Sequence, residues 1–495
     1  MTKSAIIRCD ASPTLGGGHV MRCLTLADAM AAEGYAVRFA CAAGSVEAVP
    51  ALARSRFETI TLVNPLDPAE LLGHLAEDVQ VAVIDHYGID AAYERALRAR
   101  VETVVVIDDL ADRPHDCNIL VDQNFGREAV DYAGLVPEDA AVLAGAQYAM
   151  LRPEFAHARK NALARRAATG KVGRILVSMG MTDIGGITAQ VLDAVLSAGT
   201  GAAVDVVLGS GAPSLDAVRA MAERRGDVAV HVDTADMSAL MATADLAVGA
   251  AGSTSWERCC LGLPTVALVL ADNQRRLSRA LADAGVMIAA GSVEEITAGV
   301  ARLGAAAPAR QVMSGAAAGV TDGEGVARVV RALGAAKSGE RRTLRLRPAT
   351  TADAEALWKW RNDAAARASF RNTGTVGWTD HLGWLESKLA DEGTLLRVAE
   401  LSGAPAGVIR FDRGGQTSAD VSINVDAAFR SKGFGQQLLA AGCAEVSEIG
   451  FCATLRAEIR VGNRPSRRIF EQTGFRPAGE DGEMMYLERH LAGEC

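Results

Sequence analysis

Short apolar runs alternate with helix-length segments through the first two thirds of the chain. The runs cover residues 6–9, 81–84, 104–107, 174–178, 204–208, 228–232, 246–248 and 266–270. Short strands separated by segments of this length are typical of parallel sheets with crossover helices. The pattern therefore predicts an α/β, doubly wound fold.

A segment rich in Ala, Arg and Lys, residues 156–173, interrupts this series and is predicted to be a helix that joins two sheets. We therefore place two Rossmann-like domains at residues 1–155 and 156–333. Residues 334–342 are small, polar and charged, as flexible linkers are, and a third domain follows at residues 343–495. A chain of 495 residues suits about three domains of roughly 100–200 residues each.

The third domain contains a glycine-rich turn between a predicted strand, residues 421–425, and a predicted amphipathic helix, residues 436–448. The turn consists of Arg430, Ser431, Lys432, Gly433, Phe434 and Gly435. A turn of this kind presents backbone N–H groups at a helix N-terminus, where they can hold a pyrophosphate. An ordinary tight turn is the alternative that such a short motif leaves open.

From residue 344 onward the chain resembles the GNAT acetyltransferase superfamily, which has an α+β fold. The residues that match its acyl-CoA signature and its second motif are Arg430, Gly433, Gly435, Asn463, Ser466, Gly474 and Phe475. The resemblance implies that acetyl-CoA is a co-substrate, held by residues 430–435, Asn463 and Ser466. Phe470 stands where the family commonly has a tyrosine that protonates the departing thiolate. Tyr486 is a candidate for that role by elimination, and a strand tyrosine in the sheet is the alternative.

In doubly wound sheets, ligands bind at the carboxyl ends of the strands, so the residues that follow each strand are candidates for a site. After residues 6–9 come Asp10 and then glycines that lead into a predicted helix, with His19 near its N-terminus. The positive end of the helix dipole favours the neutral, proton-accepting imidazole. The alternative is a histidine that hydrogen bonds its own turn.

Three further clusters follow strands, and they contain Asp85 and Tyr87, Asp108 and Asp109, and the run of Gly252, Ser253, Thr254 and Glu257. Acids at strand ends are also common loop-forming residues. In the last cluster, small residues leave backbone N–H groups free for a diphosphate. Glu257 either favours the helix dipole or accepts hydrogen bonds from ribose hydroxyls. Because the loop and the acid occur together, nucleotide binding is the better interpretation.

Residues 1–333 resemble the UDP-2,4-diacetamido-2,4,6-trideoxy-β-L-altropyranose hydrolases of pseudaminic acid biosynthesis, which are GT-B-like. The match lies in residues 8–12, 16–26, 85–88, 108–109 and 252–257. The resemblance implies that His19 is catalytic, and Tyr87 and Asp10 are further catalytic candidates. The substrate-binding candidates are Gly17, Gly18, Arg22, Asp85, Gly252, Ser253, Thr254 and Glu257. No metal is expected, because no set of His, Cys and carboxylate residues has metal-ligand spacing.

Composition narrows the choice of partners and compartment. A net charge of -9 with interspersed signs argues against a general nucleic-acid or anionic-membrane surface. Nine cysteines form a poor disulfide framework and fit the reducing cytoplasm. No apolar run reaches about 18 residues, and the start of the chain has no separate apolar region with a cleavage site. We therefore expect a cytoplasmic enzyme.

Together these features predict a bifunctional enzyme of pseudaminic acid biosynthesis. It would acetylate the 4-amino group of a UDP-linked amino sugar with acetyl-CoA, and hydrolyse the diacetamido UDP-sugar to free sugar and UDP. One alternative is a GT-B glycosyltransferase fused to an acetyltransferase, since fold does not set chemistry. Another is a regulatory protein that binds nucleotide sugars, which binding without turnover would support.

Overall fold

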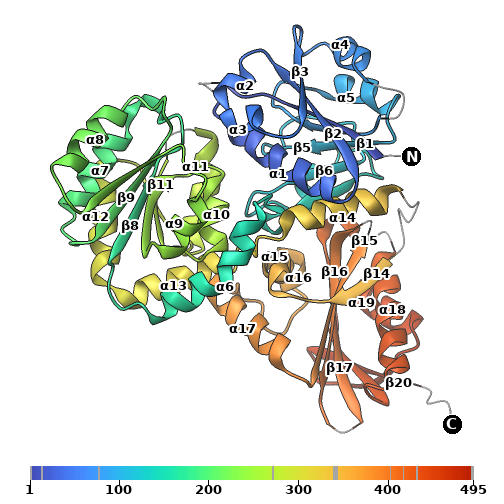
Figure 1. Ribbon diagram of the computed structural model, residues 1–495. Helices are drawn as coiled ribbons and strands as arrows, with labels where there is room; N and C mark the ends of the chain where they lie inside the picture. Colours follow the sequence, from blue (N-terminus) through green and yellow to red (C-terminus); the bar gives the residue numbers. More distant parts are fainter. Residues whose placement is uncertain are drawn as a thin grey trace. The chain divides into compact units, whose positions relative to one another are not determined.

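The computed structural model describes residues 3–12, 15–75, 79–269, 272–337, 344–401, 403–415, 417–430 and 433–491. The chain divides into two compact units. The first contains Met1–Arg127 and Gly134–Leu333, and the second contains Glu128–Ala133 and Gly334–Cys495. Figure 1 shows the elements of each unit.

The first sheet is parallel, and its seven described strands have the order β3-β2-β1-β4-β5-β6-β7. They are β1 (Lys3–Cys9), β2 (Tyr35–Ala42), β3 (Glu58–Leu62), β4 (Val79–Asp85), β5 (Thr103–Ile107), β6 (Ile119–Asp122) and β7 (Ala141–Ala144). The strand order reverses between β1 and β4, which makes their carboxyl ends a switch point. Three of these strands were predicted. The pattern did not separate β3, β6 and β7, because β6 and β7 are four residues long and β3 is only partly buried. Strand β2, which is eight residues long, was also not predicted.

Helices connect the strands of this sheet. They are α1 (Gly18–Ala32), α2 (Ser45–Ala48), α3 (Pro50–Ala53), α4 (Pro68–Gly73) and α5 (Ala91–Arg98), with a 3-10 turn η2 (Ala146–Tyr148). Helix α1 packs against β1 and β2. It buries Val20, Cys23 and Leu26, whose spacing of three residues puts them on one face. Asp90 caps the N-terminus of α5 by accepting hydrogen bonds from two backbone N–H groups.

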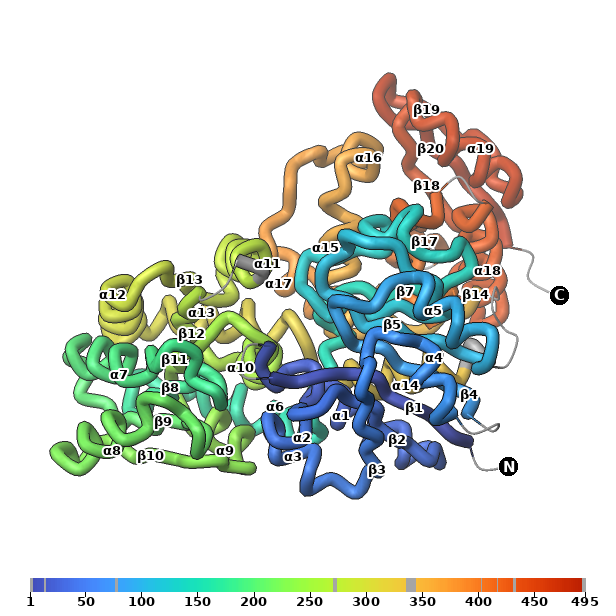
Figure 2. Tube along the Cα trace, turned by 90° about the horizontal axis from the view of Figure 1, so that it is seen from above, coloured from blue at the N-terminus to red at the C-terminus, as the bar shows by residue number. Residues whose placement is uncertain are grey.

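The second sheet is also parallel, and Figure 2 shows its described strands in the order β10-β9-β8-β11-β12-β13 from bottom to top. They are β8 (Arg174–Ser178), β9 (Ala203–Leu208), β10 (Val228–Val232), β11 (Leu246–Ala250), β12 (Thr265–Leu268) and β13 (Ile288–Ala290). Its helices are α6 (Pro153–Ala168), α7 (Thr188–Ser197), α8 (Leu215–Glu223), α9 (Met237–Thr243), α10 (Thr254–Cys260), α11 (Asp272–Asp283), α12 (Val293–Ala305), α13 (Ala307–Ala318) and α14 (Gly325–Lys337), with a 3-10 turn η3 (Ile184–Gly186). All the predicted strands of this part are present, although residue 270 lies outside the described residues. The strand order of this sheet reverses between β8 and β11, which makes their carboxyl ends a second switch point.

Helices α6 and α14 join the two sheets of this unit. The predicted helix at residues 156–173 is α6, which ends earlier, at Ala168. On α6, Arg159 donates a hydrogen bond to the carbonyl oxygen of Ala318 at 2.7 Å. A Cβ at Gly325, the first residue of α14, would lie 2.2 Å from the carbonyl oxygen of Ala149, so only glycine permits this approach. Helix α14 includes the start of the predicted linker, and residues 338–342 lie outside the described residues.

The third sheet is mixed, and its seven described strands have the order β14-β15-β16-β17-β18-β20-β19. They are β14 (Leu344–Pro348), β15 (Thr394–Leu401), β16 (Ala404–Arg413), β17 (Ser418–Val425), β18 (Thr454–Arg460), β19 (Arg476–Glu480) and β20 (Met484–His490). Its helices are α15 (Ala354–Asn362), α16 (Ala364–Arg367), α17 (Trp378–Ala390), α18 (Phe434–Glu448) and α19 (Arg464–Gln472), with 3-10 turns η1 (Ala129–Tyr132), η4 (Thr351–Asp353) and η5 (Ala427–Phe429). The predicted strand and helix around the glycine-rich turn are β17 and α18. Helix α18 packs on β16 and β17, where Ile409 and Phe411 of β16 approach Gly442.

Candidate functional site

The first candidate site lies at the switch point of the first sheet. Strand β1 pairs with β2 on one side and β4 on the other, so the loops after β1 and β4 open at the same edge. The first loop leads into α1, whose second residue is His19. Asp85 is the last residue of β4 rather than the first residue after it. The fold thus brings together residues from two of the predicted clusters.

His19 and Asp85 form a buried pair. Nδ1 of His19 lies 2.5 Å from Oδ1 of Asp85, and the two residues are 8% and 1% exposed. Burial opposes ionisation of Asp85, but Arg22 and His19 outweigh it and hold the pKa of this carboxyl well below its usual range. An ionised carboxylate only accepts hydrogen bonds, so Nδ1 of His19 carries the proton and donates it. Nε2 is therefore the nitrogen that can accept a proton.

Arg22 links this pair to a second carboxylate. Its Nε donates to Oδ2 of Asp85 at 2.6 Å, and its Nη1 donates to Oδ2 of Asp109 at 2.9 Å. Burial alone would lower the pKa of Arg22, but Asp109 and Asp85 raise it well above its ordinary value. Arg22 stays charged, and its guanidinium group fixes the positions of both carboxylates.

Tyr87 is the third side chain at this edge. Its hydroxyl donates to Oδ2 of Asp109 at 3.1 Å, and its ring meets the His19 ring edge to face with centroids 4.8 Å apart. Burial and the charge of Asp109 raise the pKa of Tyr87 above its ordinary value. The hydroxyl therefore keeps its proton and acts as a donor near His19.

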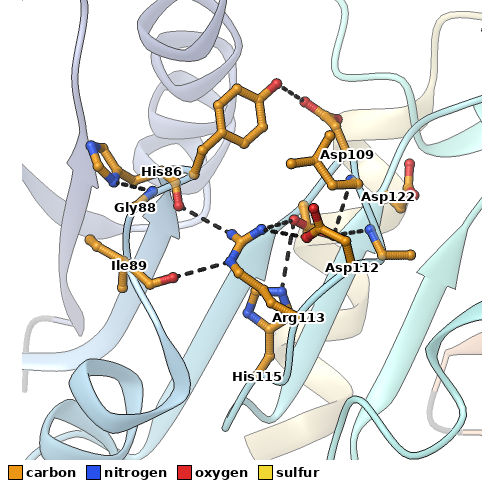
Figure 3. Close-up of polar contacts among 12 residues, drawn as sticks. His86, Gly88, Ile89, Asp109, Asp112, Arg113, His115 and Asp122 are labelled. Atoms are coloured by element: carbon orange, nitrogen blue, oxygen red, sulfur yellow. Dashed lines mark hydrogen bonds and ion pairs between the residues drawn. The ribbon is translucent and has the colours of Figure 1, made fainter. Parts of the chain in front are cut away.

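Figure 3 shows how the loop that carries Tyr87 is held. Arg113 donates from Nε to the carbonyl oxygen of Ile89 at 3.2 Å and from Nη2 to that of His86 at 3.3 Å. Its Nη1 donates to Oδ1 of Asp108 at 2.9 Å. Asp108 thus holds the loop through Arg113, while Asp109 accepts hydrogen bonds from Arg22 and Tyr87.

A cleft of about 420 Å³ adjoins this network. The predicted residues that line it are Gly18, His19, Arg22, Tyr87, Gly252 and Ser253. A Cβ at Gly18 would lie 3.6 Å from Oγ of Ser253, so the glycine loops after β1 and β11 face each other across the cleft. A Cβ at Gly252 would meet nothing within 4 Å, which leaves the backbone of that loop accessible to a ligand.

Two other candidates from the first loop do not line this cleft among the described residues. Oδ1 of Asp10 lies 2.5 Å from Nη1 of Arg8, and it accepts a hydrogen bond from the backbone of Ala42 at 2.7 Å. Burial opposes ionisation of Asp10, but His86 and Arg8 hold its pKa below the usual range. A Cβ at Gly17 would lie 2.9 Å from a methyl group of Val49. These contacts give Asp10 and Gly17 structural roles, and their predicted roles in the reaction stay predictions.

Thr254 and Glu257 lie in the first turn of α10, beside the cleft rather than among the described residues that line it. Burial raises the pKa of Glu257 to about 7, against the smaller opposing effects of Arg152 and Arg258. Arg152 forms the ion pair recorded for this carboxyl, at the long distance of 3.9 Å. Glu257 is thus a largely buried carboxyl, with a side chain that is 17% exposed and with no cation closer than Arg152 among the described residues. Its oxygens are therefore able to accept ligand hydroxyls.

The residues that follow β6 also line the cleft, and they were not predicted from the sequence. The described part of the cleft lining includes five residues after β6, Gln123, Asn124, Phe125, Gly126 and Arg127. It also includes three residues of α11, Gln274, Arg276 and Leu277. Asn124 and Arg127 donate hydrogen bonds to the backbone oxygen of Asp109 at 3.1 and 3.2 Å. A signal for these residues is present in the sequence, because the short run at residues 119–122 is followed directly by the polar residues Gln123 and Asn124. Recognising that run as a strand would have placed the two residues at its carboxyl end, where ligands bind.

The second candidate site lies in the third sheet, where β17 and β18 diverge. The described register pairs Ser418–Asp420 of β17 with Thr454–Arg456 of β18, and no later pair joins the two strands among the described residues. A cavity of about 950 Å³ is lined by residues on both sides of the divergence, including Ser422 and Asn424 of β17 and Ala457 of β18. Parting strands leave backbone groups unpaired, so a ligand can bind them there.

The glycine-rich turn precedes α18, as predicted. Gly433 has φ of 76° and is the N-cap residue, and a Cβ there would meet nothing within 4 Å. Phe434 is a buried core residue, and a Cβ at Gly435 would lie 3.2 Å from Cδ1 of Ile469. Arg430 donates from Nη1 to Oδ1 of Asp363 at 2.6 Å. Ser431 and Lys432 lie outside the described residues.

The second motif lies at the start of α19. Asn463 accepts a hydrogen bond from the backbone of Ser466 at 3.1 Å as the N-cap, and both residues line the cavity. Phe470 is buried and also lines it. Tyr486 of β20 lines the cavity too, and its hydroxyl donates to Oδ2 of Asp481 at 2.7 Å, which raises the pKa of Tyr486. The cavity therefore contains the predicted candidate for the general acid.

Within the described ranges, no group of three or more His, Cys, Asp or Glu side chains is arranged to hold a metal ion. Among the helices that the structure describes, none is long and apolar enough to cross a membrane.

Comparisons with known proteins cover both parts of the chain. Residues 343–476 match the family described as Acetyltransferase (GNAT) domain. The UDP-2,4-diacetamido-2,4,6-trideoxy-beta-L-altropyranose hydrolase of Campylobacter jejuni is 26% identical over 289 residues, which are 57% of this chain and 96% of that protein. The N-terminal part thus resembles this hydrolase and the C-terminal part has a GNAT domain, consistent with a fusion.

Two solved structures are similar to part of the chain. A ribosomal-protein-alanine N-acetyltransferase from Brucella melitensis is 26% identical, covers 30% of this chain and 99% of its own, and has a TM-score of 0.27. The N-acetyltransferase PseH of Campylobacter jejuni is 19% identical, with coverages of 30% and 99% and a TM-score of 0.25.

Proposed function

We propose that this chain is a cytoplasmic, bifunctional enzyme of pseudaminic acid biosynthesis. Its GNAT domain acetylates the 4-amino group of UDP-4-amino-4,6-dideoxy-N-acetyl-altrosamine, and its N-terminal unit hydrolyses UDP-2,4-diacetamido-2,4,6-trideoxy-β-L-altropyranose to free sugar and UDP. The observation that carries the proposal is the buried His19–Asp85 pair beside a cleft whose other wall is the loop of Gly252 and Ser253. The similarity to the Campylobacter jejuni hydrolase supports the choice of substrate.

In the proposed hydrolysis, Nε2 of His19 accepts a proton from water while the water oxygen bonds to the anomeric carbon. The bond from that carbon to the diphosphate oxygen breaks, and its electron pair leaves with UDP. Asp85 holds the Nδ1 proton of His19 and stabilises the imidazolium ion that forms. Tyr87 is a hydrogen-bond donor beside the imidazole ring and orients the sugar or the water.

The nucleotide is assigned to the second sheet. The backbone around Gly252 and the hydroxyl of Ser253 are open to the cleft and suit phosphate oxygens. Glu257 is placed to accept hydrogen bonds from ribose hydroxyls, because the nearest cation among the described residues, Arg152, is 3.9 Å away. In this assignment residues 1–155 supply the base, residues 156–333 hold UDP, and residues 334–342 lead into the acetyltransferase.

In the proposed acetyl transfer, the neutral sugar amine attacks the thioester carbon, the C–S bond breaks, and the thiolate takes up a proton. The turn at residues 430–435 holds the pyrophosphate of acetyl-CoA at the start of α18. Asn463 and Ser466 line the cavity between β17 and β18. Tyr486 is the candidate proton donor, since it lines that cavity and Phe470 has no proton to give. Holding the amine close to the thioester supplies much of the rate.

The test is incubation of the protein with acetyl-CoA and the UDP-linked 4-amino sugar, followed by mass spectrometry. The expected result is an acetylated UDP-sugar that is then converted to free diacetamido sugar and UDP. Release of UDP only when an acceptor sugar is present would indicate a glycosyltransferase. Binding of the UDP-sugar without any turnover would indicate a regulatory protein.

A further inference from the structure

The charged residues of the cleft differ in whether other protein groups already neutralise them. Among the described residues, the cleft is lined by three arginines, Arg22, Arg127 and Arg276, and by one carboxylate, Asp109. Asp109 accepts from Arg22 at 2.9 Å and from the hydroxyl of Tyr87 at 3.1 Å, so its charge is compensated within the protein.

Two of the three arginines are held by carboxylates. Arg22 contacts Asp85 and Asp109, and both of its partners are fixed by the fold. Arg127 donates from Nε to Oδ2 of Asp122 at 2.8 Å, and both side chains are buried. Their guanidinium groups therefore pair with carboxylates of the protein, and neither is a free cation for a ligand.

Arg276 differs from both. It lies on α11 and is exposed, and none of the side chains that the structure describes, which exclude those of residues 270–273, forms an ion pair or hydrogen bond with it. It lines the cleft together with Gly252 and Ser253, and a Cβ at Gly252 would meet nothing within 4 Å, so the backbone of this loop is accessible to a ligand. An exposed arginine beside such a loop can bind a phosphate group, because its planar donor groups match the geometry of phosphate oxygens.

We propose that Arg276 binds the diphosphate of the nucleotide and stabilises the charge that develops on it as it leaves. The inference rests on the proposed hydrolysis and deepens it. When the bond between the anomeric carbon and the diphosphate oxygen breaks, the electron pair stays on that oxygen and its negative charge increases. A cation beside the oxygen lowers the energy of this state more than that of the bound substrate, so Arg276 contributes to kcat as well as to binding.

The test compares Arg276→Gln with the wild-type chain by titration calorimetry, with UDP, uridine and inorganic pyrophosphate as probes. A hydrogen bond to a charged group is worth about 1.5–3 kcal/mol, so we expect the Kd of UDP and of pyrophosphate to rise roughly 10- to 150-fold. The Kd of uridine, which has no phosphate, should change less than about twofold. Arg276→Lys should recover part of the loss, because it keeps the charge without the planar fork.

Arg279→Gln is the matched control, since Arg279 is exposed on the same helix and is not among the described residues that line the cleft. It should bind all three probes like the wild type. Equal binding of UDP and pyrophosphate by Arg276→Gln and wild type would overturn the inference, as would an equal loss for uridine. If the wild type binds UDP and pyrophosphate through Arg276 but does not release UDP from the UDP-sugar, the inference about binding stands and the proposed hydrolysis fails.

Discussion

Nδ1 of His19 lies 2.5 Å from Oδ1 of Asp85, and this pair decides which nitrogen of the ring is free to take a proton. The carboxylate is the last residue of β4, while the histidine is in the first turn of α1. Because the sheet fixes one and the helix start fixes the other, the pair stays aligned before any ligand binds. Catalysis by a preorganised base avoids the cost of arranging it during the reaction.

Replacing His19 with alanine or phenylalanine should abolish hydrolysis without removing UDP-sugar binding. The expected loss of kcat is at least about a hundredfold, the lower end of what a positioned base contributes. Steady-state assays of UDP release and calorimetric titration measure the two effects separately. His157→Ala, at an exposed position on α6, should behave like the wild type. Near wild-type turnover by His19→Ala would remove this residue from the mechanism.

Glu257→Ala should mainly weaken nucleotide binding, and uridine and UDP should be affected alike because the carboxyl is assigned to the ribose. We expect Kd to rise about tenfold, as for loss of one hydrogen bond to a charged group. Catalysis lost with UDP affinity unchanged would contradict the assignment. Uridine therefore separates the role of Glu257 from that of Arg276.

The same residue should make stability depend on pH. Burial raises the pKa of Glu257 to about 7, whereas an unfolded glutamate has a value of about 4.3. The folded state therefore binds this proton more tightly, and Glu257 lowers the free energy of unfolding as pH rises from about 4 to about 7, by on the order of 3 kcal/mol. Glu257→Gln removes the ionisation, so its melting temperature relative to wild type should be higher at pH 8 than at pH 5. Glu223 is exposed on α8, so Glu223→Gln is the control and should show no such pH trend. If Glu257→Gln also showed no pH trend, burial of the Glu257 carboxyl would be refuted as the cause.

Gly433→Val should weaken acetyl-CoA binding at least about tenfold. Gly433 has φ of 76°, which a β-branched residue adopts only with strain of about 1–3 kcal/mol, and a valine side chain would occupy the open space in front of α18. Gly450→Val is the matched control, because Gly450 has φ of 62° and equally open surroundings at the other end of that helix. Fluorescence titration with acetyl-CoA measures both, and unchanged affinity in Gly433→Val would refute the role of the turn.

Acetylation should precede hydrolysis, although the chain places the hydrolase first. The proposed hydrolase substrate carries two acetamido groups, and one of them is the product of the acetyltransferase. The fragments 1–335 and 343–495, made separately, are expected to keep their own activities, and a longer fragment 1–337 retains all of α14. The acetyltransferase alone should accumulate acetylated UDP-sugar until the hydrolase fragment is added. Equally fast hydrolysis of the 4-amino and the diacetamido UDP-sugars by the intact protein would contradict this order.

The sequence by itself determined the buried strands and the loops that follow them. Strand β8 has the bounds that its apolar run predicted, because a strand buried on both faces must be apolar along nearly its whole length. Strand β10 also has the predicted bounds, although it is only partly buried at the edge of the sheet. The glycine-rich turns before α1 and α18 were also recognisable, since a positive φ or a close backbone approach restricts a position to glycine. These properties depend on neighbouring residues and are therefore local.

Tertiary structure alone decided the partner of each polar group. Asp10 and Asp85 both lie at strand ends, yet Asp10 pairs with Arg8 while Asp85 pairs with His19. Their positions at strand ends do not distinguish the two aspartates. The partner of each depends on which side of the sheet its side chain faces and, for Asp85, on a residue more than 60 positions away. The role proposed for Arg276 was equally hidden, since Arg22 and Arg127 each pair with a carboxylate and none of the described side chains pairs with Arg276.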